Sequence, residues 1–544
     1  MSMPSTVSLT VDNKVVAAIS EERFTRSKND EVFPKESIDY CLKCAGLESD
    51  HLDYVAIASF ISPMEDLIVK KSQWNIQDYV YEQKKRWKPF LIEKKVTSLA
   101  SILDIFPDKI DDSQYPGDYL KNIINKKGAQ VDTELRRKVL ADYLKIDINK
   151  VIYIDHHKAH AFYSYIASDM MGKDVLALTV DGWGDGMNAT INTFDKKGFF
   201  KRHYHTDQCH IARIYRYVTL LLGMKPNEHE YKVMGLAPYG KEKYAKGAYE
   251  VFKETLQVEG TEFKWKIKPT DSYYWFKERL EGYRFDSIAW ALQKWTENLL
   301  IKWTENCIEK YKIKNVILSG GVAMNIKAMG KISELNSVND IFVGGTASDE
   351  SLSVSAGACL IYDKLEKEGK GIKTFSKIQN LYLGPEASKD DEEKIIEKLD
   401  KSKFEVSTEI KSGVIADLLS KGLVIGRCAE RMEFGQRALG NRSILADPRN
   451  YLMREKINRA IKNRDFWMPF APIVLDKYAN EYLINPKNIK SPYMTIGFQT
   501  TNKGYEKMIS ACHPADKSAR PQILEKKHNS KLYEIILEFG KKTD

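Results

Sequence analysis

Short apolar runs alternate with longer amphipathic stretches along the chain up to about Lys373. An apolar run bounded by turn residues predicts a buried strand, and apolar positions recurring every 3.6 residues predict a helix. The elements predicted in this way are a hairpin over 7–22 that turns at Asp12–Asn13, a helix over 35–47 closed by Gly46, strands at 51–60 and 151–155, a long helix from Asp286 to Tyr311, a strand at 315–321, a helix from Asn325, a strand at 341–345 and a helix over 351–362. This alternation predicts an α/β domain whose sheet is covered by helices.

The same pattern divides the chain. Residues 62–150 are charged and weakly periodic, which favours a helical insertion. Residues 366–377 are rich in lysine and glycine and have the composition of a linker, and a second α/β unit begins near Tyr382. We therefore expect one domain over 1–373, which contains the insertion, and a second domain over 382–544.

Composition narrows the class of protein. The net charge of +9 is the balance of 84 basic and 75 acidic residues, too dilute to indicate nucleic-acid binding. No segment approaches the ~20 apolar residues that cross a bilayer, and the first residues lack the layout of a signal peptide. Seven scattered cysteines do not form a disulfide pattern. These features predict a cytoplasmic enzyme or binding protein without a membrane or nucleic-acid partner.

A cluster of histidines follows the strand at 151–155. His156, His157 and His160 fall within five positions of a chain that holds only 10 histidines. His156 and His160 are four positions apart, so a helix would carry both imidazoles on one face, one turn apart. A pair in this arrangement can bind one metal ion.

A second apolar run, at 175–180, ends in Asp181 and the sequence DGWGDG. Gly182, Gly184 and Gly186 would let backbone N–H groups close on a phosphate. A metal-binding pair beside a phosphate loop is typical of an enzyme.

Two further junctions bear on chemistry. Gly320 and Gly321 directly follow a strand, and Asn325 opens the next helix, so that a nucleotide could approach the backbone at a helix N-terminus. Asp349 stands at another strand-to-helix junction, where it is either a metal ligand or the cap of the helix that begins near Ser351.

The segment 227–240 carries Glu228, Glu230 and Lys232 ahead of a predicted loop at Gly235. Its charged side chains either act on a substrate or form a charged turn that leads into a buried loop. The residues alone leave both interpretations open.

Arginines gather in the second domain, interleaved with apolar residues and glycines: Arg427, Arg431, Arg437, Arg442 and Arg449. Partly buried guanidinium groups require anionic partners. A small dianion and a triphosphate could be these partners and would bind through bidentate contacts. The alternative partners are the acidic side chains nearby, in a network of salt bridges within the protein: Glu430, Glu433 and Asp447.

Six segments, taken in order, resemble the O-carbamoyltransferase family, which includes the tobramycin, cephamycin and nodulation-factor carbamoyltransferases. They are HHKAH, VDGWGDG, EYKVMGLAPYG, LSGGVAMN, ASDES and RMEFGQRALGNRSILADPR. The resemblance spans nearly the whole chain outside the insertion. It implies an N-terminal domain with the actin-like ATPase fold, related to the tRNA threonylcarbamoyl transferase, and a C-terminal YrdC-like α/β domain.

The resemblance also implies roles for individual residues of the first domain. One divalent metal ion is expected on His156, His160, Asp181 and Asp349. The resemblance implies iron, and the ligand types are also compatible with zinc and manganese. Nucleotide binding is expected at Gly182, Gly184, Glu230, Gly235, Gly320, Gly321 and Asn325. Glu228, as general base, and Lys232 are the expected catalytic residues, whereas His157 faces elsewhere on its helix.

In the second domain the resemblance implies that carbamoyl phosphate and ATP, with Mg²⁺, give carbamoyl-adenylate. Arg437 and Arg442 are expected to be catalytic there. Carbamoyl phosphate and ATP are expected to contact Arg431, Arg437, Asn441, Arg442, Ser443, Arg464, His513, Asp516 and Arg520. The carbamoyl group would then pass to a hydroxyl of a sugar or natural-product acceptor in the first domain, and a homodimer is compatible with this scheme.

Both ends of the chain are expected to be shorter than the family pattern. Met3 and Pro4 stand in the place of a His-Asp pair, and the sequence FGKKTD stands where the family continues into an Asn-Thr-Ser-Phe-Asn strand. This difference predicts poor carbamoyl transfer. It also keeps one alternative open, a non-catalytic nucleotide-binding remnant. A second alternative, a threonylcarbamoyl-type tRNA-modifying transferase, would share the N-terminal fold and the metal-binding helix but needs no fused arginine-rich domain.

Overall fold

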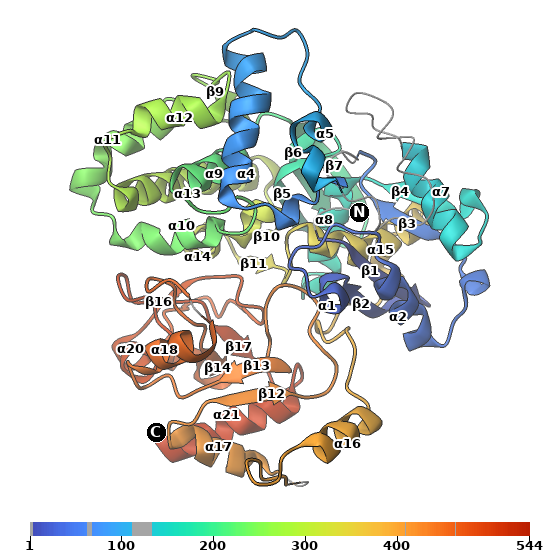
Figure 1. Ribbon diagram of the computed structural model, residues 1–544, viewed down its shortest axis with the longest axis vertical. Helices are drawn as coiled ribbons and strands as arrows, with labels where there is room; N and C mark the ends of the chain where they lie inside the picture. Colours follow the sequence, from blue (N-terminus) through green and yellow to red (C-terminus); the bar gives the residue numbers. More distant parts are fainter. Residues whose placement is uncertain (1–3, 62–67, 111–132, 408–409, 463) are drawn as a thin grey trace. The chain divides into compact units, whose positions relative to one another are not determined.

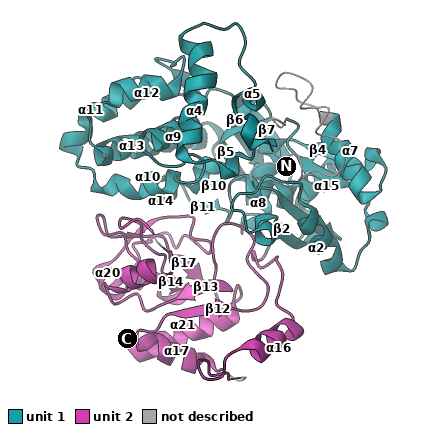
Figure 2. Cartoon of the chain, in the orientation of Figure 1, with its two compact units in different colours: residues 1–378 teal, residues 379–544 magenta. Residues whose placement is uncertain are grey.

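The computed structural model describes residues 4–61, 68–110, 133–407, 410–462 and 464–544. The chain forms two compact units, Met1–Ile378 and Gln379–Asp544 (Figure 2). Both contain helices and strands, so the protein is of the mixed α/β class.

The strands of the first unit are β1 (Thr6–Val11), β2 (Lys14–Ser20), β3 (Val55–Ala58), β4 (Val151–Ile154), β5 (Val175–Gly184), β6 (Met187–Phe194), β7 (Phe200–Thr206), β8 (Leu256–Glu259), β9 (Glu262–Trp265), β10 (Asn315–Ser319) and β11 (Asp340–Val343). Its α-helices are α1 (Glu22–Thr25), α2 (Lys35–Ala45), α4 (Ile76–Glu82), α5 (Ile102–Ile105), α7 (Thr133–Leu144), α8 (His156–Ala167), α9 (Ile211–Leu221), α10 (Glu230–Leu236), α11 (Glu242–Lys253), α12 (Ser272–Leu280), α13 (Phe285–Tyr311), α14 (Ile326–Glu334) and α15 (Leu352–Lys367).

A five-stranded sheet in the order β11-β10-β5-β6-β7 lies at the centre of this unit (Figure 1). β10 pairs in parallel with both β11 and β5. Helix α14 makes the crossover between β10 and β11 that a parallel pair requires. β5, β6 and β7 follow one another as an antiparallel meander. Helix α8 packs on β5 and β10 and against α15, which brings the start of α8 to the carboxyl end of β5.

Several predicted elements are confirmed. The β1–β2 hairpin turns at Asp12 and Asn13, whose φ angles of 48° and 60° are those of a type I′ turn. Helix α2 ends at Gly46 in the left-handed conformation, with φ of 65°. Helix α13 spans the long helix predicted from Asp286.

Two predicted loops are wrong. The glycines of DGWGDG were expected in a loop after a strand, but β5 continues through Gly184 and turns at Asp185–Gly186 into the antiparallel β6. Positive φ angles of 51° and 81° at Asp185 and Gly186 make this another tight hairpin turn. Gly235 lies inside helix α10 rather than in a loop, since α10 buries this part against α13 and packing outweighs the poor helix propensity of glycine.

The insertion expected over 62–150 lies partly outside the described residues, at 62–67 and 111–132. Its described parts hold α4, α5, α7 and a π-helical stretch over Gln83–Ile92. Trp74, Tyr79 and Phe106 share one apolar cluster with Leu220 of α9, so this segment packs on the core of the first unit.

The second unit contains α16 (Lys389–Lys398), α17 (Ser412–Ser420), β12 (Ile425–Cys428), β13 (Arg442–Leu445), α18 (Met453–Ile457), β14 (Ile473–Leu475), α19 (Ala479–Tyr482), β15 (Phe498–Gln499), α20 (Asn502–Lys507), β16 (Ser518–Ala519), β17 (Gln522–Leu524) and α21 (Ser530–Thr543). Its strands form the pairs β12–β13, β14–β17 and β15–β16. Helices α17 and α21 pack together, and Leu419, Leu445 and Leu532 belong to the core between them and the strands. Across both units, none of the described helices is long and apolar enough to cross a membrane.

Candidate metal centre and nucleotide site

Helix α8 begins directly after strand β4, and its first residues carry the histidine pair. Asp155 caps the helix by accepting the Lys158 N–H at 2.6 Å. Arg202 of β7 holds the same carboxylate through two hydrogen bonds of 2.6 and 2.9 Å. This cap fixes where α8 starts, and therefore the direction in which His156 and His160 point.

Two carboxylates complete a cluster around this pair. Asp181 comes from β5, and Asp349 begins the short 3-10 helix Asp349–Ser351. His156 Nε2 lies 3.0 Å from Asp181 Oδ2 and 3.6 Å from Asp349 Oδ1, and His160 Nε2 lies 3.4 Å from the same oxygen of each carboxylate. The cap position of this short helix is Ser348, and that of the following helix α15 is Ser351, whereas the Asp349 carboxylate is directed at the histidines.

These distances fit a metal site. The Nε2 atoms of the two histidines are 3.1 Å apart, and one ligand atom from each of the four residues lies within 4.8 Å of all the others. Metal–ligand bonds of about 2.0–2.2 Å separate neighbouring ligand atoms by about 2.8–3.6 Å at octahedral to tetrahedral angles. The buried His₂Asp₂ set can therefore hold one cation, and its ligand types suit a divalent transition metal.

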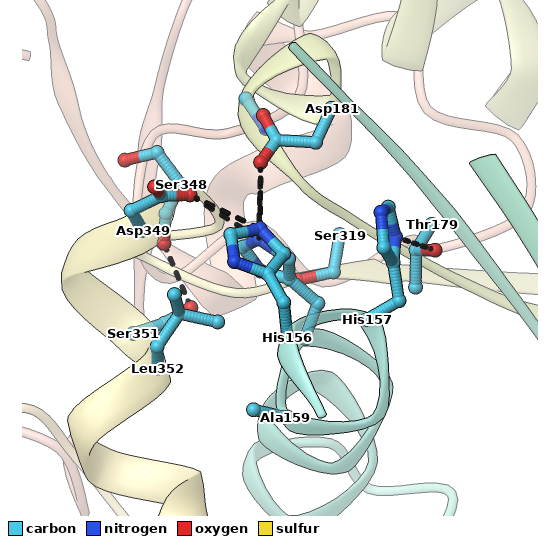
Figure 3. A network of polar contacts seen from close by, with 12 residues as sticks. His156, His157, Ala159, Thr179, Asp181, Ser319, Ser348, Asp349, Ser351 and Leu352 are labelled. Atoms are coloured by element: carbon cyan, nitrogen blue, oxygen red, sulfur yellow. Dashed lines mark hydrogen bonds and ion pairs between the residues drawn. The ribbon is translucent and has the colours of Figure 1, made fainter. Parts of the chain in front are cut away.

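Figure 3 shows His156 pointing toward Asp181 and Asp349, while His157 points away toward Thr179. His157 Nδ1 lies 2.7 Å from the Thr179 hydroxyl. Burial, together with the neighbouring His156 and His160, lowers the pKa of His157 to about 3, so this ring stays neutral. The prediction that His157 faces elsewhere on the helix is confirmed.

The cluster has strong internal electrostatics. Burial opposes the charged form of His156, but Asp349 and Asp181 outweigh it and raise the pKa of His156 to about 9. Burial also opposes ionisation of Asp181, yet hydrogen bonds from His156 and His160 hold the pKa of Asp181 well below its ordinary value. Burial and the nearby Asp181 raise the pKa of Asp349. Two carboxylates in this position require positive charge beside them, which a proton or a metal ion can supply.

A set of residues that the sequence did not single out supports His156 from behind. The Asp185 carboxylate accepts the His156 N–H at 2.8 Å, the Ser59 hydroxyl at 3.0 Å and the Ile61 N–H at 3.0 Å. Ser59 has a left-handed φ of 84°, and buried Arg136 of α7 donates to the Ser59 carbonyl at 2.7 Å. A backbone held in this conformation by surrounding contacts is common near functional sites. The available sequence signal was the Asp-Gly turn at 185–186.

The glycines near the cluster have measurable packing roles. A Cβ on Gly184 would lie 2.2 Å from Cδ2 of His156, so only glycine leaves room for that ring. Gly320 has φ of 92°, and a Cβ there would lie 2.2 Å from the Val180 carbonyl oxygen. Gly321 donates its N–H to Asp181 Oδ1 at 3.0 Å. These glycines therefore shape the metal site itself, and their nucleotide role stays a prediction.

Asn325 caps helix α14 through its Oδ1, which accepts the Ala328 N–H at 3.0 Å. Its amide also pairs reciprocally with Gln293 of α13, with both hydrogen bonds at 2.9 Å. Gln293 in turn accepts from Tyr215 of α9 at 3.1 Å and donates to Glu297 at 2.8 Å. A polar network thus links the helix after Gly320–Gly321 to helix α9.

The two glutamates of the 227–240 segment differ in environment. Glu228 is paired with Lys225, and its other oxygen lies 3.6 Å from Lys28. Glu230 accepts the Asn227 N–H at 2.7 Å, and burial raises the pKa of Glu230 to about 7. Lys232 and Gly235 lie on the same short helix, α10.

In the second unit the predicted residues cluster mainly on the hairpin between β12 and β13. The buried Glu433 carboxylate accepts N–H groups of Leu439, Asn441 and Arg442 at 2.7–3.0 Å and so folds the loop that carries Arg437. Gly440 donates its N–H to the Ser443 hydroxyl at 2.9 Å.

The arginines of this hairpin mostly donate to backbone oxygens. Arg431 donates to the carbonyls of Leu383 and Gly384. Arg442 donates to the carbonyls of Pro385, Ala429, Glu430 and Asn441 at 2.8–3.2 Å. The salt bridges expected between these arginines and nearby carboxylates are represented among the described residues by Arg449 and Asp447, whose side chains are 2.7 Å apart.

The remaining predicted residues of this unit lie on other segments. The Arg464 guanidinium stacks 5.1 Å from the centroid of the Phe470 ring. Buried His513 has Nδ1 3.4 Å from Asp516 Oδ1, and Asp516 accepts the Ser518 hydroxyl at 2.7 Å. Arg520 stands between the short strands β16 and β17. A common pocket with the β12–β13 hairpin stays a prediction.

Comparison with known proteins identifies the family. The family model described as Carbamoyltransferase N-terminus matches residues 3–360, and the model described as Carbamoyltransferase C-terminus matches residues 416–544. The chain belongs to the carbamoyltransferase family and is a transferase enzyme.

Relatives match over almost the whole chain. An uncharacterized protein of Methanocaldococcus jannaschii is 28% identical over 97% of this chain and 88% of its own length. Nodulation protein NolNO of Sinorhizobium fredii is 27% identical over 98% of this chain and 71% of its own length. Among solved structures, component A of the (R)-2-hydroxyglutaryl-CoA dehydratase of Acidaminococcus fermentans aligns with a TM-score of 0.30 at 12% identity, covering 65% of this chain and 93% of that one, a likeness too weak to define a shared fold.

Proposed function

We propose that this protein is an ATP-dependent O-carbamoyltransferase that works in two stages. In the first stage, carbamoyl phosphate, ATP and water give carbamoyl-adenylate, phosphate and pyrophosphate. In the second stage, a hydroxyl of a sugar or natural-product acceptor attacks the carbamoyl carbon, the bond to the AMP oxygen breaks and AMP leaves. The observation that carries the proposal is the match of both carbamoyltransferase models, in order, to the two parts of the chain.

We assign transfer to the first domain, 1–373, with an actin-like ATPase fold. The buried cluster of His156, His160, Asp181 and Asp349 supports this assignment. A divalent ion there, with iron as our first choice, would act as a Lewis acid toward phosphate or carbonyl oxygens. The glycines at 182, 184, 320 and 321, with Asn325, Glu230 and Gly235, would hold the nucleotide close to these residues.

The acceptor hydroxyl needs a proton acceptor, and two glutamates are candidates. Glu228 is the base expected from the sequence, but its carboxylate is already engaged in a salt bridge with Lys225. Glu230 has a pKa raised to about 7, which suits proton transfer at neutral pH. Lys232, on the same helix, would stabilise negative charge that develops on the reacting group.

We assign activation to the second domain, 382–544, as a YrdC-like unit. Arg437 and Arg442 would neutralise the charge that develops during adenylate formation. The surrounding groups proposed to bind carbamoyl phosphate and MgATP are Arg431, Asn441, Ser443, Arg464, His513, Asp516 and Arg520. A cytoplasmic location would give the enzyme both substrates.

The competing function is a threonylcarbamoyl-type tRNA-modifying transferase. The match of residues 416–544 to the carbamoyltransferase C-terminus favours the proposed function over this alternative. The dilute net charge of +9 also gives no support to tRNA as a partner.

Product analysis tests the proposal. The full chain is incubated with ATP labelled in the α-phosphate, with and without carbamoyl phosphate, and the nucleotides are separated. We expect AMP and pyrophosphate only when carbamoyl phosphate is present, and mass spectrometry should find the carbamoyl ester of an added sugar. Release of ADP without carbamoyl phosphate would instead indicate a kinase or ATPase, and nucleotide binding without turnover would indicate a non-catalytic protein.

A further inference from the structure

Helix α9 carries two arginines, Arg213 and Arg216, that the two-stage reaction leaves without a role. They are three positions apart and therefore neighbours on one helix surface. Both are half-buried. No carboxylate of the described residues lies within ion-pair distance of either guanidinium, and neither group has a hydrogen-bond partner within that part of the chain.

Glu82 and Glu230, the two carboxylates that attract the Arg216 guanidinium, already have other partners. The Glu82 carboxylate, 1% exposed, contacts Lys71 at 3.3 Å and Arg86 at 3.4 Å. Glu230 binds a backbone N–H, and its raised pKa leaves it partly neutral near pH 7. Arg216 instead lies over aromatic rings, 5.8 Å from the centroid of Tyr79. Against the effect of burial, Glu82 and Glu230 raise the pKa of Arg216, but neither carboxylate forms an ion pair with its guanidinium.

Helix geometry places this face beside the transfer site. A Cβ on Gly182, the residue after the metal candidate Asp181, would lie 3.9 Å from Cβ of Ala212. Arg216 is four residues after Ala212, one turn farther along the same face and about 6 Å along the axis. One turn beyond it, Leu220 enters the apolar cluster of the insertion, and α9 and α4 pack together (Figure 1). Arg216 therefore lies between the glycine turn and the insertion.

Half-buried guanidinium groups without partners favour a bound oxyanion, because their planar N–H forks match phosphate and carboxylate oxygens. Burial lowers the pKa of the Arg213 guanidinium, and a bound anion would relieve this cost. The nucleotide phosphate is proposed at the glycine turns themselves. An anion one helical turn away would belong to the other reactant.

We propose that Arg213 and Arg216 form a subsite for an anionic group, a phosphate or a carboxylate, on the hydroxylated acceptor. This proposal rests on the proposed function, and it narrows the acceptor class to acidic molecules such as sugar phosphates or uronic acids. The insertion would close the far side of this subsite through Tyr79.

Equilibrium dialysis with labelled inorganic phosphate tests the subsite without any turnover. We expect the double variant R213Q/R216Q to bind one phosphate equivalent fewer than the wild-type chain, or to bind that equivalent at least tenfold more weakly. The same equivalent should survive in R442Q, which alters the second domain. The matched control is R279Q, because Arg279 is an exposed arginine of the same unit that stacks 4.2 Å from the Trp275 ring.

Adding AMP distinguishes a subsite for the acceptor from a subsite for the nucleotide. If the subsite serves the acceptor, saturating AMP leaves the equivalent bound, and R213Q/R216Q binds AMP as tightly as the wild type. Displacement by AMP would assign the arginines to the nucleotide and overturn the proposal, as would equal phosphate binding by wild type and double variant. Thermal melting checks that the variants are folded. If the double variant is unstable, R216K replaces it: this variant keeps the positive charge but loses the planar fork of N–H groups, and its phosphate affinity should be lower than that of the wild type without being lost. AMP release from carbamoyl phosphate and ATP is measured separately, so failure of the subsite and failure of the proposed function give different results.

Discussion

His156 and His160 approach each other in a way that two neutral imidazoles do not favour. Their Nε2 atoms are 3.1 Å apart, and both also contact Asp181 and Asp349. Only one proton can lie between two such nitrogens, whereas a metal ion can satisfy all four ligand atoms together. The backs of both rings are near hydroxyls, with Ser59 and Ser319 each 3.5 Å from an Nδ1 atom. Contacts to the second nitrogen orient a ligating histidine.

The pKa of Glu230 yields a prediction at the residue scale. A base acts in its deprotonated form, and burial raises the pKa of Glu230 to about 7. The carboxylate is therefore about one-tenth ionised at pH 6 and about nine-tenths ionised at pH 8. We expect log kcat/KM for carbamoyl transfer to rise with pH up to about 7 and then level off.

The variants E230Q and E228Q distinguish the two candidate bases. E230Q should remove the acidic limb of the profile and slow transfer by about 10²-fold, in the range typical of a lost general base. E228Q should keep the limb. If E228Q removes it and E230Q does not, Glu228 is the base, as the sequence first indicated.

The sequence predicted the members of the metal cluster better than their surroundings. The i, i+4 spacing of His156 and His160 requires only a helix, and the structure supplies that helix with both Nε2 atoms directed at Asp181. The contacts of Asp185, Ser59 and Arg136 depend on chain segments about 30 to 130 positions apart. No local pattern in a single sequence encodes contacts over such separations.

At the scale of elements, strand β5 determines the geometry of the site. It carries Asp181 and Gly184 and then turns tightly at Asp185. The register of β5 on β6 shifts between Val180 and Gly184, which re-aims the side chains at the end of the strand. The sequence pattern showed the apolar run but not its continuation, because glycines normally indicate a loop.

The missing side chain at Gly184 predicts a specific effect on metal binding. In G184A the new Cβ would lie 2.2 Å from Cδ2 of His156, so the ring must move away from Asp181. We expect metal affinity to fall at least tenfold, measured by titration with Co²⁺ and by elemental analysis of the purified protein. G182A is the matched control, since its Cβ would meet its nearest neighbour, Ala212 Cβ, at an ordinary 3.9 Å. Equal metal content in G184A, G182A and wild type would contradict the site.

At the scale of the whole molecule, the chain combines two units with different chemistry. The first holds the buried His₂Asp₂ cluster, and the second holds the arginine-bearing hairpin folded around Glu433. The sequence indicated both units because long motifs mark each one. It could not show that Arg431 and Arg442 donate to backbone carbonyls, since those partners have no side-chain signature.

A division of labour between the units predicts that the two stages can be lost separately. H160A removes a proposed metal ligand, so carbamoyl transfer to the acceptor should be lost. The variant should still form carbamoyl-adenylate, and it should release AMP at the rate at which water hydrolyses that adenylate. R442Q should lower AMP release itself by about 10²-fold, the effect of removing a group that stabilises developing charge, and transfer should fall in parallel. Because Arg442 also holds backbone carbonyls, R437Q provides a second variant of the same hairpin.

Each variant in this experiment has a matched control. H157Q changes a buried histidine of the same helix that faces Thr179, and R449Q changes an arginine of the second unit that binds Asp447. Both controls should keep AMP release and transfer within about threefold of wild type, because neither side chain belongs to a proposed substrate site. AMP is measured by chromatography and the carbamoylated acceptor by mass spectrometry in the same reaction. If H160A abolished AMP formation while R442Q and R437Q left it intact, activation would belong to the first unit and the two-stage assignment would be wrong. Parallel loss of both products in H160A alone would mean that the metal cluster serves activation as well as transfer.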